Sequence, residues 1–454
     1  MICFETIGSA TLIVHDDGPI LTTDPWVNHG AYFGSWSHDY EIPAAQMDSI
    51  RRAKFHWFSH GHPDHLNVDS IPLLTSGQFL LSDHFGSRIH NDLTSAGHKV
   101  QILPDRKWVQ LSKHVKVCSF PNSNQDSVLL IDVNGHLVID ANDSPDLGQS
   151  WHIKRIAKAY KNTYLCQLHG WGGADMLNLF DSSGKPLKDL AALKRPIAPR
   201  SQRAAMNFGA NHVIPFSSFH RYQRTDSAWA NAMVPELDDY QRDATPGGAI
   251  VLPAFVRVDC VAGHIDAINP NRAVLELKNP EKFDDSWTDV LEAEDISLID
   301  KYFREREHLA KHFGFIEVSA GGRSHAVRLN KGLGDMGITF ECPRNSLMTS
   351  IRYEIFDDLL IGNFMKTTLH GVDDLYPNFS PYVAKYGDNG GSKSHVELKK
   401  YFHHYLMRDP IGILMTNFQT NSEMLFRSFI KEDSKVFKAA KKIFYSIGRR
   451  KQSS

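Results

Sequence analysis

The segment Ser59-His60-Gly61-His62-Pro63-Asp64-His65-Leu66 gathers three imidazoles and one carboxylate within six positions. Imidazole and carboxylate groups are ligands suited to zinc, iron or manganese. A bound metal lowers the pKa of its water ligand and so supports hydrolysis at neutral pH, whereas an iron ion with open positions can activate oxygen. These residues indicate a metal-dependent enzyme, in which Asp64 either takes up a proton from water as a catalytic base or ligates the metal.

A cluster of surface histidines without a metal is the plainer interpretation, but H-x-H-x-D-H directly after an apolar run is a demanding pattern. The apolar run Phe55–Phe58 predicts a strand that ends where the cluster begins. Pro63 disfavours a helix because it lacks an amide hydrogen. We therefore expect a loop at the carboxyl end of a strand, where irregular backbone can aim several side chains at one point.

The segments around this loop predict an α/β protein. Up to about residue 145, short apolar runs alternate with turn signals, and from 151 to about 260 helix-like stretches alternate with strand-like runs. This rhythm is typical of sheets covered by helices. After Pro270 the chain becomes more charged, and a predicted helix precedes further strands. We predict a metal-binding domain over residues 1–275 and a C-terminal α+β accessory domain over 276–454.

Composition excludes several classes of protein. With 42% hydrophobic and 22% charged residues the chain is an ordinary ordered one, and 50 basic against 52 acidic residues leave no global field that would attract nucleic acid. No stretch approaches the roughly 20 apolar residues of a transmembrane helix, and the start lacks the features of a signal peptide. Five separated cysteines without a C-x-x-C pair favour a reducing compartment. We expect a cytoplasmic protein without a nucleic-acid partner, and the sequence leaves the oligomeric state open.

The H-x-H-x-D-H loop after a strand resembles the metal-binding motif of the metallo-β-lactamase superfamily, whose fold is an αββα sandwich. Residues 22–26 resemble an early strand that ends in an aspartate behind the metal loop, which makes Asp24 a candidate support for the ligands. Residues 138–144 resemble the strand whose last aspartate bridges two metals. That match falls best on Asp143, with Asp140 as the alternative. The resemblance thus implies a ligand set of His60, His62, Asp64, His65 and Asp143.

The superfamily supplies two further histidines, but their places in this sequence fall near Asn122 and on Pro215. An amide oxygen binds a divalent metal weakly, and proline cannot bind one. His169 and His220 each follow an apolar run and are candidates to replace the missing ligands, although each could equally be an ordinary hydrogen-bonded histidine or a substrate contact. The resemblance therefore implies one or two divalent ions, zinc or iron.

Within the superfamily the chain is most similar to the metallo-β-lactamase-like part of CMP-N-acetylneuraminate hydroxylases. Short matching segments occur in the same order, at residues 24–26 followed by the aromatic residues 32, 33 and 36, then at 59–66, 126–127, 135–136, 172–174, 215–216 and 356–364. Those hydroxylases also carry a Rieske iron-sulfur domain, which needs the paired motifs C-x-H and C-x-x-H. This sequence lacks the pair, so an oxygenase built on it would need electrons from a separate partner or from the substrate.

The resemblance points to carbohydrate metabolism. We predict a hydrolase that uses a metal-bound water on an anionic sugar, a sugar nucleotide or a phosphoester-like small molecule. An iron-dependent hydroxylase with a separate electron donor is one alternative, and a non-catalytic binding or scaffold protein with a degraded metal site is the other. Arg221 and Arg224 are candidate contacts to an anionic substrate, although loop arginines are more often simply solvated. Residues 434–450 form an amphipathic pattern that favours a terminal helix packed on its own domain over one docked on a membrane.

Overall fold

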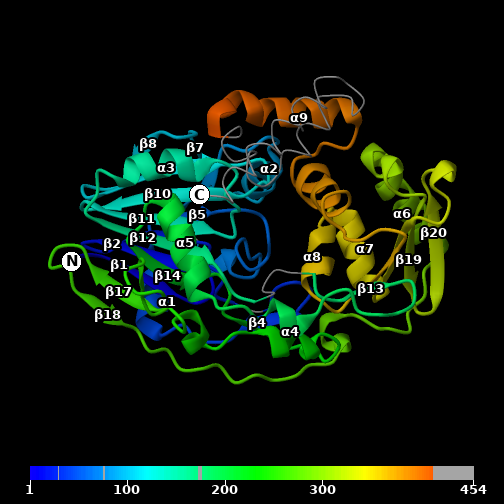
Figure 1. Cartoon of the computed structure of the whole chain (residues 1–454), viewed down its shortest axis with the longest axis horizontal. Helices are drawn as coiled ribbons and strands as arrows, with labels where there is room; N and C mark the ends of the chain where they lie inside the picture. Colours follow the sequence, from blue (N-terminus) through cyan, green and yellow to red (C-terminus); the bar gives the residue numbers. More distant parts are fainter. Residues whose placement is uncertain (29, 75–76, 172–175, 413–454) are drawn as a thin grey trace, which may run out of the picture.

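Two β-sheets packed face to face carry the histidine loop in the computed structural model, which describes residues 1–28, 30–74, 77–171 and 176–412 (Figure 1). The strands of the first sheet, in spatial order, are β18 (Ile265–Ala267), β17 (Val256–Asp259), β1 (Ile2–Ile7), β2 (Thr11–Asp16), β3 (Pro19–Thr23), β5 (Phe55–Phe58), β6 (Gln78–Ser82) and β7 (Val100–Leu103). Strands β1, β2 and β3 pair antiparallel, whereas β3, β5, β6 and β7 run parallel. The carboxyl ends of the parallel strands therefore meet at one edge of the sheet.

The second sheet has a similar mixture of strand directions. Its order is β16 (Ile250–Val251), β14 (His212–Phe216), β12 (Asn162–Leu168), β11 (His136–Asn142), β10 (Ser127–Val133), β9 (Val115–Pro121) and β8 (Trp108–Gln110). Strands β10 and β11 are almost continuously apolar and are buried along nearly their whole length. Such runs are typical of strands covered on both faces.

Three apolar layers hold these sheets and their helices together. Between the sheets, side chains such as Phe4, Trp57 and Leu129 form a shared core. Helices α3 (Gln149–Ala157) and α5 (Ala198–Phe208) cover the outer face of the second sheet, and α1 (Ala44–Arg52) and α2 (Arg88–Ser95) cover that of the first. The predicted αββα sandwich is confirmed by these layers.

A third sheet with its own core follows in the chain. Its order is β13 (Leu179–Asp181), β22 (Lys366–His370), β21 (Gly337–Glu341), β19 (Phe315–Ala320) and β20 (Arg323–Arg328). Helices α6 (Ala293–Glu305), α7 (Arg344–Tyr353) and α8 (Phe356–Ile361) pack against it. The predicted α+β character of this region is confirmed. β13 comes from the first part of the chain, and the boundary between residues 275 and 276 stays a prediction.

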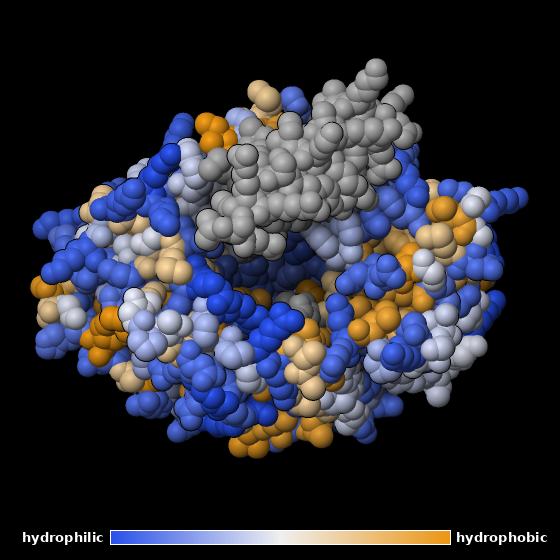
Figure 2. All heavy atoms as spheres, in the orientation of Figure 1, coloured by the Kyte–Doolittle hydropathy of each residue, from blue (hydrophilic) through white to orange (hydrophobic). Residues whose placement is uncertain are grey.

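Smaller elements join the two regions. β4 (Trp36–His38) pairs with β15 (His220–Tyr222), and a π-helical segment (Pro381–Asn389) leads to α9 (His395–Arg408). The other helices are α4 (Leu190–Leu193) and short 3₁₀ turns at Ile71–Leu73, Ala228–Met233, Leu237–Tyr240, Pro280–Phe283, Glu307–Lys311 and Lys331–Leu333. The surface is hollowed between the sandwich and the region of α7 and α8 (Figure 2).

Two sequence motifs fall outside the described residues: the segment 172–174 and the amphipathic segment 434–450. Among the residues that the structure does describe, no helix combines the length and the apolar character that a bilayer-spanning helix requires.

Candidate metal centre

The histidine loop begins where β5 ends. The backbone carbonyl of His62 closes its turn by accepting hydrogen bonds from the amides of His65 (3.0 Å) and Leu66 (2.8 Å). The loop predicted at the carboxyl end of this strand is confirmed. The turn brings the three imidazoles together, with ring centroids 4.2 Å apart for His60 and His65 and 4.6 Å apart for His60 and His62.

Asp24 lies behind the loop, directly after β3, and is fully buried. Its Oδ1 accepts a hydrogen bond from the amide of Ser59 (2.7 Å), and its Oδ2 accepts one from the Ser59 hydroxyl (2.7 Å) and lies 3.1 Å from Nδ1 of His65. The side-chain amide of Asn142, at the end of β11, donates to the same carboxylate. Asp24 therefore fixes both the start of the loop and the ring of His65.

Asp64 and Asp143 flank the other nitrogen of His65. Asp64 Oδ2 lies 3.2 Å and Asp143 Oδ2 3.3 Å from His65 Nε2. His60, His65 and Asp143 each offer one ligand atom, and these three atoms lie within 4.8 Å of one another. Asp140, the alternative to Asp143, is buried in β11 and belongs to no such group among the described residues. The geometry favours Asp143 as the aspartate that faces the histidines.

The charges of these groups depend on one another. Burial alone lowers the pKa of His65, but the carboxylates of Asp64 and Asp143 outweigh burial and raise that pKa well above its usual value. Burial raises the pKa of Asp64, and the attraction of His65 outweighs it and lowers that pKa to about 2. For His60, burial and the neighbouring histidines lower the pKa well below its usual value. His60 is therefore neutral, which is the form of imidazole that binds metals.

His62 connects the loop to the C-terminal region. Its Nδ1 lies 2.8 Å from Nε2 of His60, and its Nε2 lies 3.0 Å from Oδ2 of Asp357 in α8. Lys385, in the π-helical segment, places its Nζ 3.4 Å from the same Nε2. His60 in turn has its Nδ1 2.9 Å from the hydroxyl of Ser59. Each of the three histidines thus has an oxygen partner on one nitrogen and directs the other toward its neighbours in the site.

Four further residues belong to this arrangement and were not predicted as site residues. Tyr32 donates a hydrogen bond to Asp64 Oδ1 (2.5 Å), and Asp126 Oδ1 lies 3.8 Å from Nζ of Lys385. Asp126 and Asp357 both fall in segments that resemble the hydroxylase family, which was a usable signal. Tyr32 also falls in a segment of that resemblance. No sequence pattern singled out Lys385, which lies more than 300 residues from the loop in the chain.

The structure leaves the remaining candidate ligands outside this group. The amide of Asn122 donates to the hydroxyl of Ser144 (2.8 Å), and His220 stacks on Trp36 with ring centroids 3.4 Å apart. His169 is buried after β12. Neither His169 nor His220 belongs to a described cluster of three histidine, cysteine or carboxylate ligand atoms, and neither do His62 and Asp64. As ligands, all of these residues and Asn122 stay predictions.

Neither arginine that was predicted to contact an anionic substrate is well placed for it. Arg224 is fully buried and pairs with Asp226 (2.8 Å) and Asp285 (2.6 Å), which favours a structural role for it over a substrate contact. Arg221 pairs with Asp39 at 2.9 Å. A buried arginine paired in this way stabilises a local ion-pair network and has no donors directed at a ligand.

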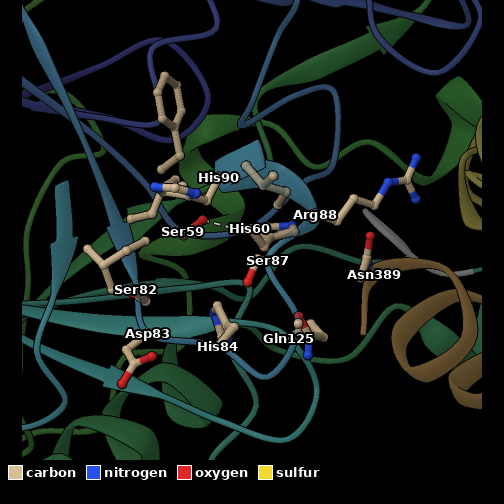
Figure 3. A pocket seen from close by; sticks show the side chains of 15 residues that line it. Ser59, His60, Ser82, Asp83, His84, Ser87, Arg88, His90, Gln125 and Asn389 are labelled. Carbon is tan, nitrogen blue, oxygen red and sulfur yellow. Dashed lines mark hydrogen bonds between the residues drawn. The ribbon is translucent and has the colours of Figure 1, made fainter. Parts of the chain in front are cut away.

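A cavity of about 220 Å³ opens beside His60 (Figure 3). Polar side chains from three parts of the chain line it, among them Ser59, His84, Gln125 and Asn389. Its size suits a small molecule or part of one. The cavity gives the histidine loop a space in which a substrate could lie.

The residues present fit a divalent metal. Nε2 of His65 is buried and makes no hydrogen bond with any described residue, although two carboxylate oxygens lie near it. Imidazole nitrogens and carboxylate oxygens are the donors that zinc and non-haem iron take. An inward nitrogen on each histidine, with an oxygen partner on the other nitrogen, is also the pattern of metal-binding histidines.

The amino-acid sequence matches no protein-family profile. It is 29% identical over 133 residues to cytidine monophosphate-N-acetylneuraminic acid hydroxylase of Asterias rubens, and the aligned segment is 27% of this chain and 20% of that relative. The chain therefore matches about a fifth of the length of this relative. The predicted resemblance to such hydroxylases is confirmed for that segment.

Solved structures with a similar fold include metal-dependent enzymes. CmlA, a diiron β-hydroxylase from Streptomyces venezuelae, is 15% identical over 57% of this chain and 54% of its own, with a TM-score of 0.37. Igni18, a metallo hydrolase from Ignicoccus hospitalis, is 13% identical over 57% of this chain and 99% of its own, also with a TM-score of 0.37. YhfI from Bacillus subtilis, a metallo-β-lactamase fold protein, covers 46% of this chain with a TM-score of 0.27. We assign a metallo-β-lactamase-like fold to this chain on the basis of the αββα layers described above.

Proposed function

We propose that this protein is a metal-dependent hydrolase that acts on an anionic sugar, a sugar nucleotide or a phosphoester-like small molecule. The observation that supports it is the orientation of the three loop histidines, whose inward nitrogens face one another and the carboxylates Asp64 and Asp143. The proposed metal ligands are His60, His62, Asp64, His65 and Asp143.

A divalent ion held by these residues supplies a Lewis acid, which lowers the pKa of water and polarises a carbonyl or phosphoryl oxygen. The chain's own residues then position the proton acceptor. Asp64 is a carboxylate over the whole physiological range, and the Tyr32 hydroxyl holds its Oδ1 at 2.5 Å. A carboxylate fixed in this way is suited to accept a hydrogen bond from water and to orient it, while its low pKa makes it only a weak proton acceptor. The cavity beside His60 would admit the substrate.

An iron-dependent hydroxylase is the second candidate, and the similarity to the hydroxylase of Asterias rubens favours it. Histidines and carboxylates also suit non-haem iron. Because the sequence lacks the paired Rieske motifs, this hydroxylase would take electrons from a separate protein or from the substrate. A non-catalytic binding or scaffold role would apply if the site held no metal.

Elemental analysis of protein purified without added metal tests these proposals. We expect zinc or iron in stoichiometric amount in the wild type and its loss in His62→Ala. His403→Ala is the matched control, because His403 is exposed on α9, and it should retain the metal. Zinc favours hydrolysis, and iron with substrate-dependent oxygen consumption favours the hydroxylase. A wild-type protein that takes up neither metal, even when both are supplied, would refute the enzymatic proposals.

A further inference from the structure

The oxygen partners of the three loop histidines come from two different regions of the chain. His60 and His65 are held by Ser59 and Asp24, both of which belong to the sandwich. The partner of His62 is Asp357, which lies 295 residues further along the chain. The histidine loop is therefore not complete within the sandwich, and the C-terminal region supplies its third support.

The contact between His62 and Asp357 is buried and has a lysine beside it. The exposed fraction of the side chain is 10% for His62 and 7% for Asp357. Nζ of Lys385 lies 3.7 Å from Oδ2 of Asp357 and 3.8 Å from Oδ1 of Asp126. One ammonium thus lies between two carboxylates, and all three groups are withdrawn from solvent.

Apolar contacts hold α8 in the C-terminal region without help from these charges. On α8, Phe356, Leu359 and Leu360 pack into the apolar core of that region, which is sufficient to anchor the helix. Buried charges are costly to desolvate, and replacing a buried ion pair by well-packed apolar residues is often neutral or stabilising. Asp357 instead points away from this core to His62, which indicates a role at the histidine loop.

We propose that Asp357 is a positioning residue of the metal centre, with Lys385 as its counter-ion. Asp357 accepts a hydrogen bond from Nε2–H of His62, so the proton of this imidazole stays on Nε2. The lone pair is then on Nδ1, which faces His60. This proposal rests on the proposed function in one respect, because it makes Nδ1 of His62 a metal ligand. It also gives a function to the segment 356–364, whose resemblance to the hydroxylase family had no chemical explanation.

Metal affinity is the first test. In the purified full-length protein, titrated with zinc or iron(II), Asp357→Ala should bind about 10–100-fold more weakly than the wild type, which is the usual effect of losing such a partner. Asp357→Asn keeps an oxygen that accepts the hydrogen bond and should recover part of the loss. Asp295→Asn is the matched control: Asp295 is also fully buried in the C-terminal region, but it pairs with Arg344 on the far side from the loop (2.6 Å). Equal affinity in the wild type and Asp357→Ala would overturn the proposal.

The orientation of His62 is the second test, and it does not depend on any metal. In metal-free protein labelled with ¹⁵N-histidine, with the signals of His62 assigned through His62→Gln, we expect the pattern of a ring protonated on Nε2. Asp357→Ala should change that pattern, and Asp295→Asn should not. An unchanged His62 signal in Asp357→Ala would overturn the proposal. A wild type that binds no metal would refute the proposed function, whereas this measurement would still decide whether Asp357 holds His62.

Discussion

Two groups of buried histidines in this protein differ in what holds their rings. The histidine loop places each imidazole between an oxygen partner and the centre of the site. The second group is the pair His38 and His220, which lie opposite each other in β4 and β15. His220 stacks on Trp36 and His38 on Trp26, with centroids 3.4 Å and 4.1 Å apart. Neither nitrogen of either ring has a hydrogen-bond partner among the described residues.

Burial alone therefore does not distinguish the proposed metal-binding histidines from this stacked pair. Burial lowers the pKa of His38 to about 4 and that of His220 to about 3, and it also lowers the pKa of His60. A low pKa is thus common to both groups. What distinguishes the loop is the oxygen partner, which orients the ring and fixes which nitrogen carries the proton.

The largest expected difference in metal affinity is between variants that lack one histidine of each group. His65→Ala removes a nitrogen that lies within 3.3 Å of two carboxylates, and we expect metal affinity to fall by a factor of at least about 100, since a lost ligand costs more than a lost partner. His220→Gln should bind metal within a few-fold of the wild type. Calorimetric titration of both variants with zinc and iron(II) provides the comparison. An equally large loss in His220→Gln would show that a stacked histidine without an oxygen partner also serves as a ligand.

Sequence reasoning predicted an α/β protein and the loop because both depend on local signals, whereas the αββα sandwich followed from the family resemblance. Apolar runs such as residues 128–131 specify buried strands, and Pro63 with its neighbouring histidines specifies a turn. Asp24 and Asp143 were found through the order of short motifs rather than through spacing. Tyr32 lay in a segment of the family resemblance but was given no role, and Lys385 could not be found, because nothing local distinguishes a lysine that contacts a distant loop. Two histidines of the superfamily motif are absent at their expected places, near Asn122 and at Pro215. The number of metal ligands therefore could not be predicted from the sequence.

The pH dependence of folding tests the stacked pair, whose rings are kept neutral by burial. The pKa of His38 is about 4 in the folded protein against 6.5 in the unfolded chain, so its contribution to stability is fully present above pH 6.5 and is lost as the pH falls toward 4. Between pH 7.5 and pH 5 this loss amounts to about 2 kcal/mol. In urea unfolding at these two pH values, His38→Gln should lose correspondingly less free energy of unfolding than the wild type does. The same acid loss in both proteins would show that His38 is not kept neutral by burial.

The smallest effect on metal binding is expected at a third cluster, formed by Cys3, Glu5 and His15. Their ligand atoms lie within 4.8 Å of one another, as those of the histidine loop do. Here, however, the carboxylate of Glu5 is already paired with Arg257, and His15 Nε2 lies 3.7 Å from it. Burial raises the pKa of the Cys3 thiol to about 11, and a thiol must lose its proton to bind a metal.

Cys3→Ser should therefore leave the number of bound ions unchanged, and its cost in stability should be about 1–3 kcal/mol because it buries a polar hydroxyl in place of a thiol. Metal analysis of this variant beside His65→Ala measures the difference between the clusters directly. Loss of an ion in Cys3→Ser, with the ion retained in His65→Ala, would place the metal at the Cys3 cluster. Close approach of ligand atoms would then identify a metal site better than the orientation of the rings or the charges of their neighbours. We expect the reverse, because the histidine loop has two carboxylates that no arginine or lysine neutralises among its described contacts, whereas Glu5 has its cation.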